Sequence, residues 1–241
     1  MLLLALDTAT SAVTVALHDG DRVLAEASTV DPRAHGERLA PGIDAVLREA
    51  GVAPGQLTHI VCGLGPGPFT GLRVGIVTAR VLALATGAAL HGVCSLDALA
   101  YAAASAAPPG GQPGALAGGE LLVATDARRK EVYWARYAVS ARGAVSELSS
   151  GAVVTALTAP SVVRPAELPA SVRDLPTAGR GPLLYPELFG RAVPPWDVDA
   201  AALARLAVAR LAAGDPLADH EPYYLRRPDA APNVTRKSAL G

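Results

Sequence analysis

The chain has 241 residues, of which 51% are hydrophobic and 18% are charged, and its formal net charge at pH 7 is −1. This length and composition support a sizeable core and one or two domains. Because the net charge is close to zero, it does not indicate a nucleic-acid-binding protein or one that adheres to an anionic membrane.

From the start of the chain we expect no signal peptide. The segment "MLLLALDTAT" has no basic region before its apolar run and reaches Asp7 early. Arg73 and Arg80 interrupt the nearest approach to a membrane span, which needs about 20 apolar residues. We therefore expect a cytoplasmic protein with no membrane segment. Cys62 and Cys94 fit neither a disulfide framework nor a zinc site, and we expect them to be reduced core residues.

The first 106 residues predict three strands followed by alternating helices and strands. A turn at Gly20 joins the second and third strands. Leu39, Ile43, Val46 and Leu47 recur at helical spacing in the first predicted helix. The predicted strands are 2–7, 11–19, 21–29, 57–62 and 89–93, and the predicted helices are 35–50, 69–86 and 95–106.

This order is typical of an α/β layer fold with a mixed sheet. The ribonuclease-H-like (ASKHA) fold of the actin, Hsp70 and sugar-kinase superfamily has the same order. We expect two subdomains with mixed sheets flanked by helices. They are residues 1–106 and a smaller unit, residues 120–196, joined by a Pro/Gly linker at 107–119.

The second unit starts with two strands joined by the charged turn "DARRKE", and another strand lies near 151–156. No elements are assigned in 159–182. Residues 197–241 predict a helix and an extended tail that packs back on the body through Tyr223, Tyr224 and Leu225. Either Asp199 or Asp197 lies near the N-cap of this helix.

The segment "GLGPGPFTGLRVGIVTARVLALATG", residues 63–87, resembles a phosphate loop that leads into a helix. It lacks the lysine and hydroxyl of a P-loop, and Pro66 and Pro68 remove two backbone donors. Its glycines also miss the Rossmann spacing by one residue. In "DTATSA", Ala9 stands where an actin-like ATPase has glycine, and Asp7 is typical of an Asx-turn. We therefore expect no cofactor.

Small residues recur at every fourth position of this segment, which places them on one helix face. Such a face permits close approach of a second backbone. Because the helix is apolar almost all round, either the second subdomain covers it or another subunit does. The small residues are Gly67, Gly71, Gly75, Ala79, Ala83 and Gly87.

Five segments together identify a family resemblance: "LLLALDTATSAVTVAL", "HGERLAPGIDAVLREAG", "GLGPGPFTGLRVGIVTARVLALATGAALHGVCSLDALA", "DARRKEVYWARY" and "EPYYLRRPDA". The chain resembles the TsaB (YeaZ) family of bacterial tRNA threonylcarbamoyladenosine biosynthesis. The resemblance covers most of residues 1–138 and the C-terminal region, and it is weak in 139–195. It implies an actin-like fold and a non-catalytic dimerisation subunit that pairs with the catalytic paralogue TsaD. The ATPase TsaE joins that complex, and tRNA meets this chain indirectly.

In this family the first two helices form the pairing surface. The corresponding residues here are Leu39, Ile43, Val46, Leu72, Arg73, Gly75, Ile76, Ala79, Arg80 and Ala83. A homodimer through the same helices is also expected when the partner is absent. Glutamate at Gly75 or Ile76 is expected to abolish pairing and to leave the fold intact.

The catalytic paralogue binds its metal through two histidines, and Ser95 and Leu99 stand at the matching positions here. Leucine cannot ligate a metal, so we expect neither a metal site nor catalytic residues. The five histidines form no evident constellation. Two alternatives stay open, namely an actin-fold ATPase or phosphotransferase, and a direct tRNA-binding module that uses the basic segments 128–130 and 236–237.

Overall fold

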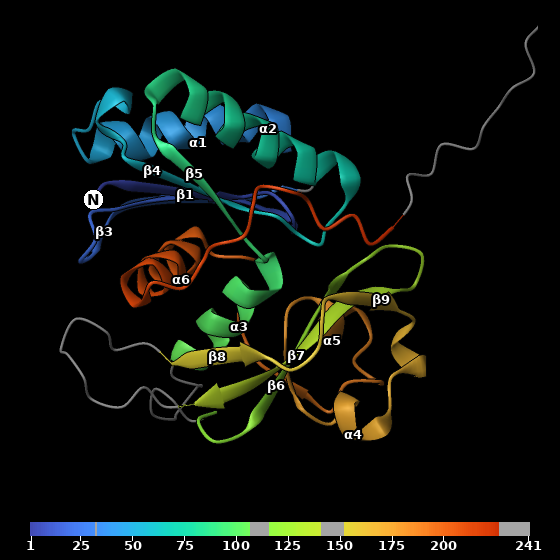
Figure 1. The fold of residues 1–241 in the computed structure, drawn as a ribbon. Helices are drawn as coiled ribbons and strands as arrows, with labels where there is room; N and C mark the ends of the chain where they lie inside the picture. Colours follow the sequence, from blue (N-terminus) through green and yellow to red (C-terminus); the bar gives the residue numbers. More distant parts are fainter. Residues whose placement is uncertain (32, 107–115, 141–151, 227–241) are drawn as a thin grey trace, which may run out of the picture.

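The computed structural model describes residues 1–31, 33–106, 116–140 and 152–226 of the chain. These residues form two mixed sheets with helices outside and between them (Figure 1). Most of the predicted linker, residues 107–115, and the end of the tail, residues 227–241, lie outside the described residues.

The N-terminal sheet has the strand order β3-β2-β1-β4-β5. Strands β1, β2 and β3 are antiparallel neighbours, whereas β4 and β5 continue the sheet parallel to β1. The predicted order of strands and helices through residue 106 is confirmed. The strands are β1 (Leu3–Asp7), β2 (Ala12–His18), β3 (Val23–Val30), β4 (His59–Gly63) and β5 (Ala89–Val93).

The second sheet has the order β11-β10-β6-β7-β8, and β9 also pairs with β7. The two predicted strands around the charged turn are confirmed as its central hairpin. The strand predicted near 151–156 is confirmed as β8, whereas β9 and β10 lie in 159–182, which the sequence pattern left unassigned, and β11 follows that segment. The strands are β6 (Glu120–Asp126), β7 (Val132–Ser140), β8 (Val153–Ala156), β9 (Ser161–Val163), β10 (Pro176–Ala178) and β11 (Arg191–Ala192).

Helices cover the sheets in layers. In Figure 1, α1 and α2 lie together on the outer face of the N-terminal sheet, and α6 and α3 lie between the two sheets. Helix α6 contacts β1 and β2, so the last long helix among the described residues covers the first sheet. The helices are α1 (His35–Glu49), α2 (Phe69–Thr86), α3 (Ser95–Ser105), α4 (Ala170–Arg173), α5 (Gly181–Leu184) and α6 (Ala200–Ala213), with short 3-10 turns at Pro54–Gln56 and Pro165–Glu167.

Strand β1 is apolar at consecutive positions because both of its faces are buried. Leu3 and Ala5 join the core between the sheets, whereas Leu4 and Leu6 join the core beneath α1 and α2. Successive strand residues point to opposite faces, so a strand between two helix layers needs apolar residues at both. Alanine-rich α3 and α6 fill the layer between the sheets, where small side chains permit close approach.

The helix ends follow the predicted signals. The carboxylate of Asp199 caps α6 by accepting from the backbone N–H of Ala201 at 2.9 Å, and Gly214 ends the helix in the left-handed region. Asp197, the other candidate, does not cap the helix, and its carboxylate pairs with Arg180 instead. Helix α1 continues through Pro41, whose position is solvent-exposed, so water can hydrogen-bond the carbonyl that the proline leaves without a donor.

The segment after α6 returns along the N-terminal half, as the orange-red trace in Figure 1 shows. Ala218 pairs with Gly92, and the N–H of Tyr223 donates to the carbonyl of Leu64 at 2.9 Å. The ring of Tyr224 then packs on Phe69 at the start of α2, with ring centroids 5.2 Å apart. The described part of the tail therefore connects the second half of the chain to the first helix layer.

Candidate functional site

A buried hydrogen-bond network joins β1, the glycine loop and α3. The Ser95 hydroxyl donates to Oδ2 of Asp7 at 2.5 Å and accepts from the Gly65 N–H at 3.0 Å. Asp7 also accepts from the N–H of Ala9, which is the Asx-turn expected from the sequence. Burial raises the pKa of Asp7 to about 6, although these hydrogen bonds lower it. The Asp7 side chain thus links β1 to α3 and, through Ser95, to the glycine loop, and it is fully buried.

The small-residue face of α2 lies against its own chain. A Cβ at Gly71 would lie 2.8 Å from the carbonyl oxygen of Thr8, and one at Gly75 would lie 2.5 Å from its hydroxyl oxygen. A Cβ at Gly67 would lie 2.4 Å from the carbonyl oxygen of Ala9. The glycines thus permit a close approach of α2 to the β1–β2 turn, and this face is closed to a partner helix.

Most residues expected at the pairing surface are therefore core residues. Those buried beneath α1 and α2 are Leu39, Ile43, Val46, Leu72, Gly75, Ile76, Ala79 and Ala83. Because Ile76 is only 3% exposed, the expectation that glutamate there or at Gly75 spares the fold is wrong. Arg73 and Arg80 are the members of the set that lie on the outer surface.

The outer face of α2 carries an exposed apolar strip, which we define as Val77, Val81 and Leu84. Val81 is 61% exposed and Leu84 is 87% exposed. The spacings of three and four residues place the strip on one side of the helix, with Arg73 one turn before it. By length and composition, α2 is the one helix in the described part of the chain that could cross a membrane. This is weak evidence for a membrane span, because the helix packs on a sheet.

The sequence pattern missed this strip because α2 has two apolar faces. Val77 and Val81 recur at the same four-residue spacing as the small residues and follow Gly75 and Ala79 by two positions. Helical periodicity does not state which face meets the sheet. The strip could have been recognised from residue size, since a helix that lies tightly on a sheet turns its smallest residues inward.

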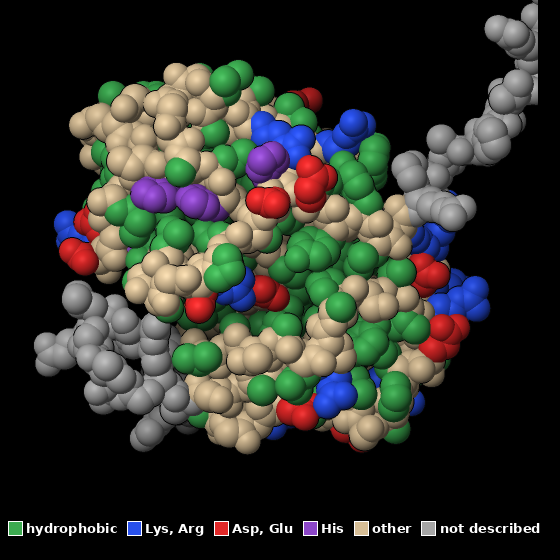
Figure 2. All heavy atoms as spheres, in the orientation of Figure 1, with side chains coloured by type: hydrophobic (Ala, Val, Ile, Leu, Met, Phe, Trp, Pro, Cys, Tyr) green, Lys and Arg blue, Asp and Glu red, His purple; other side chains and the backbone are tan. Residues whose placement is uncertain are grey.

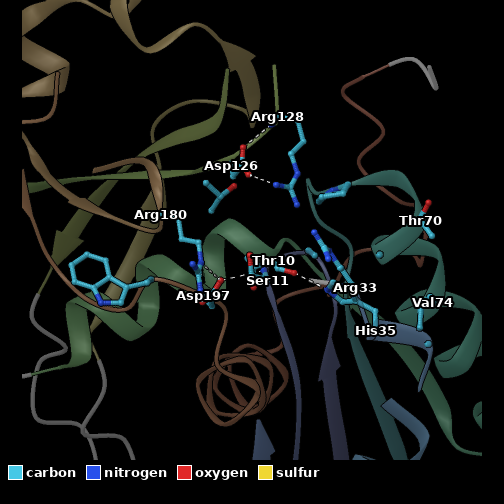
Figure 3. A pocket seen from close by; sticks show the side chains of 16 residues that line it. Thr10, Ser11, Arg33, His35, Thr70, Val74, Asp126, Arg128, Arg180 and Asp197 are labelled. Carbon is cyan, nitrogen blue, oxygen red and sulfur yellow. Dashed lines mark hydrogen bonds and ion pairs between the residues drawn. The ribbon is translucent and has the colours of Figure 1, made fainter. Parts of the chain in front are cut away.

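A cleft lies between the two halves of the molecule (Figure 3). The β1–β2 turn and the starts of α1 and α2 form one wall, whereas the β6–β7 turn, Arg180 and Trp196 form the other. The cavity measures about 170 Å³. Its charged lining consists of Arg33, Asp126, Arg128, Arg180 and Asp197.

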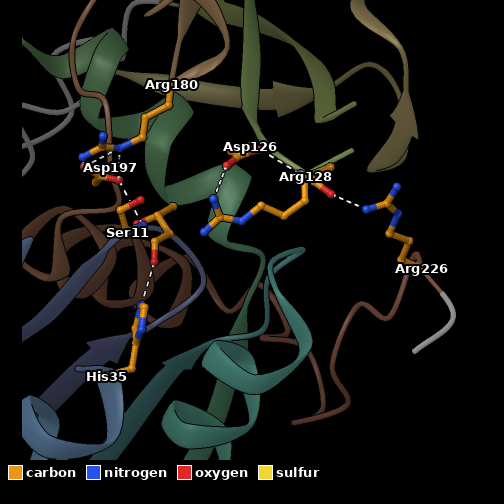
Figure 4. A network of polar contacts seen from close by, with 9 residues as sticks. Ser11, His35, Asp126, Arg128, Arg180, Asp197 and Arg226 are labelled. Atoms are coloured by element: carbon orange, nitrogen blue, oxygen red, sulfur yellow. Dashed lines mark hydrogen bonds and ion pairs between the residues drawn. The ribbon is translucent and has the colours of Figure 1, made fainter. Parts of the chain in front are cut away.

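Ion pairs clamp the back of this cleft (Figure 4). Nε and Nη2 of Arg180 donate to the carboxylate of Asp197, with a shortest distance of 2.6 Å. The same carboxylate accepts from the backbone N–H of Ser11 at 3.2 Å, which links it to the N-terminal half. Arg128 pairs with Asp126 at 3.0 Å in the β6–β7 turn, on the same wall as Arg180. Asp197 therefore ties the two halves together through Arg180 and Ser11, a role that its sequence position beside a helix start did not indicate.

The β1–β2 turn offers few free donors to a nucleotide phosphate. The N–H of Ala9 donates to Asp7, and the N–H of Ser11 donates to Asp197. Within the described ranges, His, Cys, Asp and Glu form no cluster of three that could hold a metal ion. His35, near the same turn, hydrogen-bonds the carbonyl of Thr10 through Nε2 at 2.9 Å.

Charges on the visible face are mixed. In Figure 2, arginine and lysine side chains lie beside aspartate and glutamate side chains, and no broad area of one sign is seen on that face. In the basic turn, Arg128, Arg129 and Lys130 have positive φ angles of 62°, 52° and 62°. Asp126 pairs with the first of them, and Glu131 pairs with Arg226 of the tail.

Comparison of the sequence with known proteins gives a consistent set of relatives. The family model for TsaD, tRNA N6-adenosine threonylcarbamoyltransferase, matches residues 22–155. An uncharacterized protein of Mycobacterium leprae is 39% identical over an alignment of 241 positions that covers 96% of this chain and 56% of that protein. Escherichia coli TsaB, named a tRNA threonylcarbamoyladenosine biosynthesis protein, is 38% identical over 137 residues, covering 57% of this chain and 55% of its own length. The chain thus spans about half the length of the curated relatives it matches.

A solved structure of YeaZ from Pseudomonas aeruginosa matches nearly the whole chain. The TM-score is 0.73 at 30% sequence identity, and the match covers 93% of this chain and 99% of that one. A second structure from that organism, titled as similar to peptidase YEAZ, gives the same TM-score at 31% identity. The expected actin-like (ASKHA) fold with two mixed sheets is confirmed.

Proposed function

We propose, because the chain belongs to the TsaB/YeaZ family, that it is a non-catalytic subunit of the tRNA threonylcarbamoyladenosine machinery. In this proposal it pairs with a TsaD-type catalytic subunit, which transfers threonylcarbamoyl to the adenosine next to the anticodon. The observation that carries the proposal is the exposed apolar strip on α2 in a chain whose relatives are named for this pathway.

The exposed strip supports pairing on physical grounds. A contiguous apolar surface rimmed by polar residues is typical of a protein–protein contact. Arg73 and Arg80 border the strip, and Arg80 is held by the carbonyl of His220 at 2.8 Å. The outer face of α1 is more polar, with Asp44 and Arg48 paired on it. We therefore place the centre of the interface on α2 and its rim on α1.

The same surface suits a second copy of this chain when the catalytic partner is absent. We also propose that a TsaE-type ATPase joins the complex, that tRNA is bound chiefly by the assembled complex, and that the protein acts in the cytoplasm. An activity of its own as an ATPase gains little support, since the turn donors that a phosphate would need are occupied.

The test uses Val81→Glu with Val30→Glu as the matched control. Val30 lies at the end of β3 and is 60% exposed, close to the 61% of Val81, so both changes place one charge on an exposed valine. Co-elution with the TsaD-type subunit is measured by size-exclusion chromatography with light scattering, and folding by thermal unfolding.

We expect Val81→Glu to weaken pairing by about 10- to 100-fold, because a buried unpaired charge at an interface centre costs roughly 1.4 to 3 kcal/mol or more. Val30→Glu should pair normally, and both variants should unfold near the wild-type temperature. Equal pairing of the two variants would show that the strip is not the interface.

A further inference from the structure

We propose that the C-terminal tail supplies part of the docking surface for the TsaD-type subunit, at a cluster of Phe69, Arg73 and Tyr224 that receives a carboxylate side chain of that partner. These three residues, which we define as the anchor cluster, lie at the start of α2. The inference rests on the proposed function. It adds a contact from a segment far from α1 and α2 in the sequence, and it specifies the charge of the group that the partner presents there.

The side chains of the anchor cluster stack on one another. The rings of Phe69 and Tyr224 have centroids 5.2 Å apart, and the guanidinium of Arg73 lies 4.8 Å from the centroid of the same Phe69 ring. The electron-rich face of an aromatic ring attracts a cation. Phe69 is nevertheless 37% exposed and Tyr224 is 47% exposed, and Arg73 is exposed as well. The cluster is therefore ordered by its own contacts and still open to a partner.

The anchor cluster continues the apolar strip towards the start of the helix. Phe69 and Arg73 precede Val77 by eight and four residues, so all three lie along the same side of α2. Val77, the first residue of the strip, is 53% exposed. Tyrosine, phenylalanine and arginine are enriched in protein interfaces, where a few residues carry most of the binding energy. An interface centred on the strip therefore reaches the anchor cluster.

Contacts on both sides of Tyr224 hold the tail at this place. Before it, the N–H of Tyr223 donates to the carbonyl of Leu64 at 2.9 Å. After it, Arg226 pairs with Glu131 of the β6–β7 turn. The tail thus passes the start of α2 as a tethered segment, which the orange-red trace in Figure 1 shows. A ring that is positioned before the partner arrives loses less conformational entropy on binding.

Arg73 specifies the chemistry of the partner. Its guanidinium forms no ion pair with any residue that the structure describes, and its one contact there is with the Phe69 ring. Arg80 on the same helix differs, because the tail occupies it through the carbonyl of His220 and the carboxylate of Glu221. A guanidinium with free donors beside apolar side chains matches a carboxylate. The partner should therefore present an aspartate or glutamate next to the apolar side chains that cover the strip.

The test measures the dissociation constant of the complex between the full chain and the TsaD-type subunit of the same organism. Isothermal calorimetry is run at about 0.05 M and about 0.5 M NaCl, because salt screens an ion pair at an interface rim. The variants are Tyr224→Ala, Tyr224→Phe and Arg73→Gln. Arg22→Gln is the matched control, since Arg22 is an exposed arginine in the turn between β2 and β3. Val81→Glu is included because it tests the proposed function itself.

We expect Tyr224→Ala to weaken pairing about 10-fold at both salt concentrations, because it removes a ring from the contact. Tyr224→Phe keeps the ring and should bind within about two-fold of wild type. Arg73→Gln should weaken pairing about 10-fold at low salt and about two-fold at high salt, because the lost ion pair is already screened there. Arg22→Gln should match wild type at both.

The failures of the two proposals are distinguishable. Wild-type affinity of Tyr224→Ala overturns the role of the tail, and wild-type salt dependence of Arg73→Gln overturns the carboxylate contact, even if Val81→Glu abolishes pairing. Normal pairing of Val81→Glu refutes the proposed interface as a whole. Each variant changes an exposed side chain, and thermal unfolding verifies that each remains folded.

Discussion

Gly75→Ala tests whether the small-residue face of α2 serves intramolecular packing. The Thr8 hydroxyl donates to the Gly71 carbonyl at 2.7 Å and accepts from the Gly75 N–H at 3.0 Å. A Cβ at Gly75 would lie 2.5 Å from that hydroxyl oxygen and must displace it. The change would therefore break both hydrogen bonds at a buried position.

The cost follows from these contacts. A buried polar group left without a partner costs about 1–3 kcal/mol, and overpacking a core costs about 1–3 kcal/mol more. The higher helix propensity of alanine offsets up to about 1 kcal/mol. We expect Gly75→Ala to lower the free energy of unfolding by about 3 kcal/mol, measured by urea denaturation.

Two comparison variants make the result specific. Gly42→Ala in α1 places a Cβ at an ordinary 3.5 Å from Val15, so it should stabilise by about 0.5–1 kcal/mol. Thr8→Ala removes the clashing hydroxyl, so the double variant Thr8→Ala/Gly75→Ala should be more stable than the sum of the single effects by about 1 kcal/mol or more. Strict additivity, or a Gly75→Ala variant as stable as wild type, would refute this account of the helix face.

Three further outcomes follow from the buried polar groups. Since the pKa of Asp7 is raised to about 6, the stabilising contribution of its protonated form is present below pH 4 and is lost as the pH rises through 6. Relative to Asp7→Asn, the free energy of unfolding of wild type in urea should fall by about 2 kcal/mol between pH 4 and pH 7. Asp197→Ala leaves Arg180 unpaired, so it should destabilise by about 1–3 kcal/mol and speed amide exchange around the cleft, whereas unchanged exchange would contradict the clamp. Burial raises the pKa of the Cys62 and Cys94 thiols, so mass spectrometry should find both unmodified by iodoacetamide at pH 8 in the native protein and both modified in urea.

Local patterns predicted most of the first half of the fold. The alternating and continuous apolar runs fixed β1 to β5, and the glycines at positions 51 and 214 marked the ends of α1 and α6 in the left-handed region. These features depend on a few neighbouring residues, so the sequence expresses them directly. The short elements in 159–182 were not predictable, because strands and helices of three or four residues are too short to show a hydrophobic period.

The sequence by itself determined the order of elements through residue 106, the missing phosphate-loop lysine and the presence of two apolar faces on α2. Only the tertiary structure decided which of those faces is buried, because that depends on Thr8 and Ala9 of a distant turn. It also decided the cleft, since Arg33 of the loop before α1 and Thr125 of β6 line one cavity only when the two halves pack together through α3 and α6. Close packing and charge balance between segments far apart in the chain leave no local pattern, and for this reason both features appeared only in the folded molecule.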